Sequence, residues 1–66
     1  MPSDGFAATL QRIRTARGLT QEALAARAKV SRPYITMLER GKGDPSLAVL
    51  RRLARALDVP VAVLLS

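Results

Sequence analysis

The chain has 66 residues and contains no cysteine, so a small core without disulfide bonds must hold its fold together. A domain of this length buries only about 60% of the surface that its unfolded chain exposes, which requires efficient packing. Apolar residues make up 48% of the sequence, but only Phe6 and Tyr34 are aromatic. The interior must therefore consist of Leu, Ile, Val and Ala, a composition that suits short packed helices better than a sheet.

The first expected helix is amphipathic and starts near Phe6. Leu10 and Ile13 follow at helical spacing on the same face, and Gly18 ends the helix because glycine adopts the left-handed conformation without steric cost. The preceding residues, 1–5, show no such periodicity. We predict that they form a flexible N-terminal arm.

The next two helices are predicted from residues that cap helix N-termini. Thr20 precedes a short, alanine-rich helix over residues 21–28. Ser31 precedes a third helix, with Pro33 in its first turn, where a missing N–H costs nothing. A helix of two turns is unstable alone, so these helices must pack against each other.

The C-terminal third of the chain predicts two more helices. Residues 41–46 form the clearest loop, in which Asp44 or Ser46 caps a fourth helix over residues 47–57. The sequence Asp-Val-Pro at residues 58–60 ends that helix and starts a short fifth one. The apolar side of the fourth helix is expected to face the core, and its opposite, solvated side carries Arg51, Arg52 and Arg55.

Several functional classes lack the side chains that they need. Histidine and cysteine are absent, which removes thiolate nucleophiles, the usual zinc ligands and the side chain best suited to proton transfer at neutral pH. The five carboxylates form no obvious close pair. The N-terminal sequence has no signal-peptide plan, and no apolar run is long enough to span a bilayer. We expect a cytoplasmic protein with no catalytic residue, no metal, no cofactor and no membrane partner.

The charge balance favours an anionic partner. Eleven Lys and Arg residues stand against five Asp and Glu, a formal net charge of +6, and nine of the eleven are arginine. Arginine makes bidentate hydrogen bonds to phosphate groups and to guanine edges, so the composition points toward nucleic acid. An acidic protein or an anionic lipid surface remains possible on charge alone.

The most informative segment, TQEALAARAKVSRPYITMLERG, contains the second helix, a tight turn and the third helix. Two helices that cross steeply need a small side chain at the crossing, and Ala25 supplies it. The outward side chains of the third helix gather in its N-terminal half, the half that a recognition helix presents to base edges in the major groove. The inward set is Leu24, Ala28, Val30, Ile35 and Leu38, and the outward set is Arg32, Pro33, Thr36 and Met37.

The chain resembles the Cro/repressor (XRE) family of helix-turn-helix regulators from Leu10 to about Leu65. The matching segments are IRTARGLTQ, LTQEALAARA, SRPYITMLERGK, DPSL and LARALDVPVAVLL. The resemblance implies an all-α fold, a compact five-helix bundle of the lambda-repressor-like type, as a single domain over residues 1–66. It also implies a homodimer that reads a palindromic operator on double-stranded DNA with the third helix in the major groove.

The resemblance also implies roles for individual residues. Gln21 is similar to the glutamine that clamps a phosphate, and Lys42 lies where members follow the phosphates. Tyr34 fits packing or a phosphate better than a base, and Met37 is evenly balanced between a base contact and the core. The residues expected to contact DNA are Gln21, Arg32, Pro33, Tyr34, Thr36, Met37, Arg40 and Lys42.

Other positions match structural features of the family. Arg14 and Glu39 fall where members place a largely buried ion pair. The apolar C-terminal edge matches the place where members dimerise, so we expect Val61, Leu64 and Leu65 at the dimer interface.

Lys29 departs from the family pattern. Members usually have glycine in this turn because the backbone there has a positive φ, and a lysine in that conformation costs about 1 kcal/mol. The following Val30 and Ser31 still match the family, so this departure does not overturn the resemblance, and the sequence leaves the conformation of the turn at Lys29 open.

Three classes of function remain to be weighed. A DNA-binding regulator is the leading interpretation. The alternative is an antitoxin or adaptor module whose main partner is another protein, such as a toxin, and failure to bind operator DNA at physiological salt would favour it. An enzyme is disfavoured by the residue inventory, and a membrane-surface peptide is disfavoured because Gly and Pro divide the chain into short helices.

Overall fold

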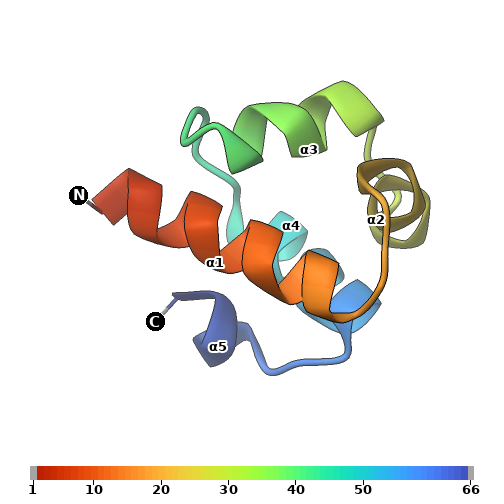
Figure 1. Cartoon of the computed structure of the whole chain (residues 1–66). Coiled ribbons are helices and arrows are strands. Elements are labelled where there is room, and N and C mark those ends of the chain that lie inside the picture. Colours follow the sequence, from red (N-terminus) through yellow and green to blue (C-terminus); the bar gives the residue numbers. More distant parts are fainter. Residues whose placement is uncertain (1, 66) are drawn as a thin grey trace.

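The computed structural model describes residues 2–65, and over this range the chain forms five helices and no strands (Figure 1). The helices are α1 (Pro2–Ala16), α2 (Gln21–Ala28), α3 (Arg32–Glu39), α4 (Leu47–Leu57) and α5 (Val61–Leu65). This confirms the predicted all-α, five-helix architecture. None of the described helices combines the length and the apolar character needed to cross a membrane.

Hydroxyl caps start the three middle helices. The side-chain oxygen of Thr20 accepts the N–H of Ala23 at 3.0 Å, and those of Ser31 and Ser46 accept equivalent N–H groups at 3.2 Å. Each bond satisfies one of the amide groups that a helix N-terminus leaves without a partner. Both predicted caps, Thr20 and Ser31, are confirmed, and Ser46 rather than Asp44 caps α4.

The first four helices all end in the same left-handed turn. Its left-handed residue is Gly18, Lys29, Gly41 or Asp58, with φ between 58° and 78°. In each turn the next residue donates its N–H to the carbonyl five residues earlier, as in Val30 to Ala25 at 3.0 Å. Lys29 has a φ of 59°, so the turn whose conformation the sequence left open is left-handed although it lacks a glycine.

The start of α1 differs from the expectation. The helix begins at Pro2, so residues 2–5 belong to it, where we predicted a flexible arm; Met1 lies outside the described residues. Proline is well suited to the first helical position because its φ already matches the helix and its missing N–H has no partner there. Amphipathic periodicity does not reveal such a first turn.

The core collects apolar side chains from all five helices. Ala25, the small residue predicted at the crossing of α2 and α3, is 3% exposed, and α2 packs on both α3 and α4. In Figure 1, α3 lies along one edge of the molecule and α5 near the opposite edge, with α1 and α4 between them. The largest buried side chains are Leu10, Leu24, Ile35, Leu38, Leu53, Leu57 and Leu64. Packing on one side of α3 leaves its other side at the surface.

Candidate nucleic-acid interface

The exposed side of α3 forms a shallow cavity of about 470 Å³, here called the α3 hollow. It is lined by six residues from α3 and the segment after it, and all six belong to the set expected to contact DNA. Three of them carry positive charges, and none carries a carboxylate. The lining residues are Arg32, Pro33, Thr36, Met37, Arg40 and Lys42.

The three cations of the hollow are exposed. Arg32 lies in the first turn of α3, Arg40 directly follows the helix, and Lys42 is in the loop beyond. Within the part of the chain that the structure describes, none of these three side chains forms an ion pair. Their charges are therefore available to an anion, and the excess of positive charge over the chain, +6, strengthens the local field.

Met37 and Tyr34 lie closer to the core than Arg32 does. Both are half-buried and pack against the core cluster. The Met37 side chain also runs across Gly43, because a Cβ built on Gly43 would lie 2.6 Å from Met37 Cε. Met37 therefore supports the loop after α3 while part of it lines the hollow, whereas Tyr34 is not among the lining residues.

A partly buried ion pair connects α1 to α3. Arg14 Nε donates to Glu39 Oε2 at 2.6 Å and Arg14 Nη2 donates to Oε1 at 3.1 Å, so the pair is bidentate. The side chains are 13% and 4% exposed, respectively. Arg14 Nη1 also donates to the carbonyl of Leu19 at 2.7 Å, which fixes the turn after α1. The structure thus contains the ion pair that the family resemblance implies.

Gln21 extends this pair into the recognition surface. Its Nε2 donates to Glu39 Oε1 at 3.0 Å, and its Oε1 accepts the hydroxyl of Thr36 at 2.9 Å. Neither bond could be predicted from the sequence, because the partners are 18 and 15 residues apart and meet only when α2 crosses α3. Gln21 therefore joins α2 to α3, and through Glu39 it is connected to Arg14 of α1.

Only some of the α5 residues that were predicted at the dimer interface are exposed at the surface. Leu64 is fully buried in the core of its own domain, so the prediction that it contacts a second subunit is wrong. Five residues of helix turn successive side chains in different directions, and packing on α4 and α1 draws Leu64 inward. Val61 is half-buried, while Val63 and Leu65 are 38% and 61% exposed.

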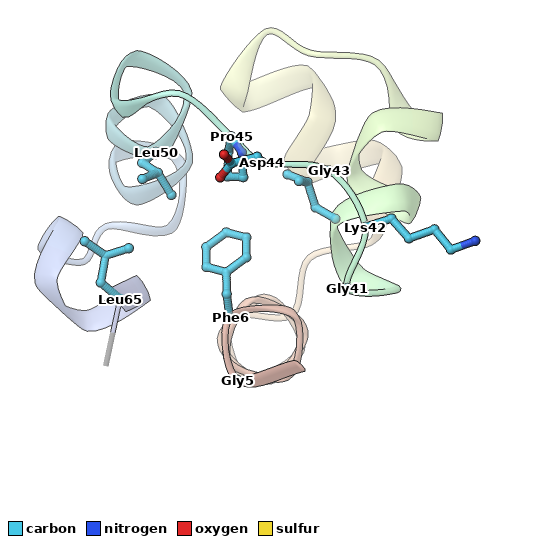
Figure 2. Close-up of a pocket in the computed structure, with 10 residues that line it drawn as sticks. Gly5, Phe6, Gly41, Lys42, Gly43, Asp44, Pro45, Leu50 and Leu65 are labelled. Carbon is cyan, nitrogen blue, oxygen red and sulfur yellow. The ribbon is translucent and has the colours of Figure 1, made fainter. Parts of the chain in front are cut away.

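A second and more apolar hollow lies beside Leu65, with a volume of about 590 Å³. Figure 2 shows the Phe6 ring rising from α1 into it, toward Asp44 and Pro45, with Leu50 and Leu65 on one side. The hollow and the exposed Leu65 side chain form one apolar surface, which is separate from the α3 hollow in its lining except for Lys42.

Comparisons with known proteins match most of the chain. The helix-turn-helix family model HTH_3 matches residues 10–64. An uncharacterised HTH-type transcriptional regulator, y4dJ of Sinorhizobium fredii, is 46% identical over 48 residues, which are 73% of this chain and 62% of that protein. The immunity repressor protein of Bacillus phage phi105 is 40% identical over 55 residues, 83% of this chain and 38% of the repressor. The chain therefore spans less than two thirds of the length of these relatives.

A solved structure extends the likeness to the whole fold. The restriction-modification controller protein C.AhdI from Aeromonas hydrophila superposes with a TM-score of 0.91 and 39% sequence identity. The match covers 94% of both chains, so the two differ little in size.

Proposed function

Since the chain belongs to the helix-turn-helix family of transcriptional regulators, we propose that it is a sequence-specific regulator that binds double-stranded DNA. The observation that carries this proposal is the α3 hollow. It combines exposed cations, which form no ion pair among the described residues, with a hydroxyl and apolar groups on the surface side of α3. Phosphates attract the cations, and base edges in the major groove match the mixture of polar and apolar groups.

The residues of this surface fall into two groups, those proposed to contact bases and those proposed to contact phosphates. Arg32 and Pro33 lie in the first turn of α3 and Thr36 one turn further on; these three are proposed to contact bases, with Met37 at the edge of this group. Gln21, Tyr34, Arg40 and Lys42 flank it and are proposed to contact phosphates. One N–H of the Gln21 amide is held by Glu39, which leaves the other for a phosphate oxygen.

We further propose that the regulator acts as a homodimer on a palindromic operator. One α3 covers only a half-site, and two recognition helices on one face of the duplex need a separation of about 34 Å. The described domain measures 27 × 23 × 22 Å, so two domains side by side would approach that separation. The exposed Leu65 and the apolar hollow beside Phe6 are the proposed contact surface.

Selection of bound sites from random duplexes, followed by footprinting, tests this function. We expect a palindrome whose half-sites are about one helical turn apart, protected by two copies of the chain. Leu65→Asp should weaken dimer formation and operator binding together while the domain stays folded. Protection of an isolated half-site by one copy would contradict the dimer, and the absence of any enriched sequence would contradict the function.

A further inference from the structure

The network around Glu39 determines the direction of its hydrogen bonds. Arg14 can only donate, and the ionised carboxylate of Glu39 can only accept. The group of Gln21 that faces Glu39 at 3.0 Å must therefore be its NH₂, which turns the Gln21 carbonyl oxygen toward Thr36. The orientation of the amide follows from the charge of its neighbour.

Thr36 must then donate to Gln21. Its hydroxyl lies 2.9 Å from Gln21 Oε1, an acceptor, so the single hydroxyl proton is committed to that bond. Thr36 also lines the α3 hollow, where its oxygen lone pairs and its methyl group remain. Toward a ligand in the hollow, the Thr36 hydroxyl can accept a hydrogen bond but has no proton to donate.

We propose that Thr36 reads DNA only as a hydrogen-bond acceptor and recognises the exocyclic amino group of an adenine or a cytosine. In the major groove the adenine N6 and cytosine N4 amino groups donate, whereas guanine O6 and N7 and thymine O4 only accept. A guanine in the same place would bring its acceptor atoms against the Thr36 oxygen, which also only accepts, so no hydrogen bond could form. Gln21 and Glu39 are positioning residues in this scheme, and the inference rests on the proposed DNA-binding function.

The first experiment locates the base and removes its amino group. Site selection with the wild type and with Thr36→Val, which has a similar shape but no hydroxyl, identifies the base pair whose preference depends on Thr36. In that pair, adenine is replaced by purine, or cytosine by 2-pyrimidinone, which lack only the amino group. Wild-type affinity should fall about fivefold, the value of one ordinary hydrogen bond, while Thr36→Val should lose nothing further.

The second experiment releases the hydroxyl proton. Gln21→Ala removes the acceptor, so Thr36 becomes able to donate to guanine. The ratio of affinities for the preferred site and for a site with guanine at that position should fall about fivefold. Lys42→Ala is the matched control, because losing a charge in the same hollow should weaken both complexes and leave the ratio unchanged. Thermal unfolding of each variant verifies that it is folded.

The outcomes separate this inference from the function on which it rests. Suppose that the wild type selects a sequence, but that removing the amino group lowers the affinity of the wild type no more than it lowers the affinity of Thr36→Val. Acceptor reading by Thr36 is then overturned, and DNA binding stands. A Thr36→Val variant with unchanged preference at every position, or an unchanged ratio in Gln21→Ala, overturns it as well. If the wild type enriches no sequence, the proposed function and the inference fail together.

Discussion

The two ends of α3 are held in different ways. At the C-terminal end, Glu39 bonds to side chains of two other helices, and Gly41 and Gly43 follow with φ of 78° and 81°. At the N-terminal end, one cap from Ser31 and a left-handed Lys29 suffice. Both ends turn the chain sharply, but only one of them is tied to the rest of the domain by charged hydrogen bonds.

This difference separates stability from recognition. The Glu39 carboxylate is committed to Arg14 and Gln21 within the domain, so Glu39 contributes mainly to folding. The N-terminal end, where Arg32 and Pro33 are exposed, can change its side chains at little cost to the fold. We therefore expect substitution of Glu39 to reduce the free energy of unfolding, and substitutions at the N-terminal end to reduce affinity for DNA.

Glu39→Ala should have the largest effect. It leaves Arg14, which is 13% exposed, without its partner, and breaking such a pair costs about 3 kcal/mol. The whole domain is expected to have a stability of only about 3 to 10 kcal/mol, so the variant should unfold at far lower denaturant concentration. Urea unfolding followed by circular dichroism measures this.

A matched control is Glu22→Ala. Glu22 is an exposed carboxylate in the first turn of α2, and its loss should cost about 0.5 kcal/mol through the helix dipole. Equal losses for the two variants would show that the C-terminal end of α3 is not held by its ion pair.

Arg32→Ala tests the opposite end. It should cost about 1 to 3 kcal/mol of binding free energy on the preferred site and much less on random DNA, with unfolding unchanged. Lys42→Ala should weaken both complexes more evenly, because a phosphate contact carries no sequence information. Fluorescence titrations on both duplexes give the comparison, and equal losses for Arg32→Ala would remove Arg32 from the base-reading residues.

Gly43→Ala should destabilise the loop after α3. An alanine at position 43 would have to adopt the left-handed φ of 81°, which costs about 1 kcal/mol. Its Cβ would also meet Met37 Cε at 2.6 Å, so the flexible end of the Met37 side chain must move aside, and we expect a loss slightly above that value. Gly18→Ala shares the left-handed backbone but meets nothing within 4 Å, and it should cost only about 1 kcal/mol. If denaturant unfolding shows no difference between the two variants, Met37 does not brace the loop.

Local signals predicted the parts of the fold that depend on neighbours in sequence. Thr20 and Ser31 act within one turn of themselves, so their caps could be predicted without knowing the packing. The bond from Thr36 to Gln21 could not, because its partners meet only through the crossing of α2 and α3. The inward turn of Leu64 likewise depends on where α5 packs.

The family resemblance supplied what local signals could not. It indicated the pairing of Arg14 with Glu39, which the structure contains, whereas it left the conformation of the turn at Lys29 open. It did not indicate that residues 2–5 continue α1, since the resemblance begins only at Leu10.

The smallest expected effect concerns the strain at Lys29. Its φ of 59° costs a non-glycine residue about 1 kcal/mol, and Lys29→Gly would relieve it. Glycine also gives the unfolded chain more entropy, which offsets part of the gain, so we expect a neutral to slightly stabilising substitution in urea unfolding. Lys29→Ala, which removes the charge but keeps the strain, is the control.

Asp58→Gly gives an independent measure of the free-energy cost of a left-handed φ, because Asp58 occupies an equivalent turn with a φ of 58°. Aspartate tolerates the left-handed region better than lysine does, so Asp58→Gly should gain less than Lys29→Gly. An ordinary helical or extended residue would instead lose about 0.5 to 1 kcal/mol on change to glycine. A clear loss at Lys29 would therefore mean that the turn is not left-handed in solution, and the angle at which α2 presents α3 to DNA would have to be revised.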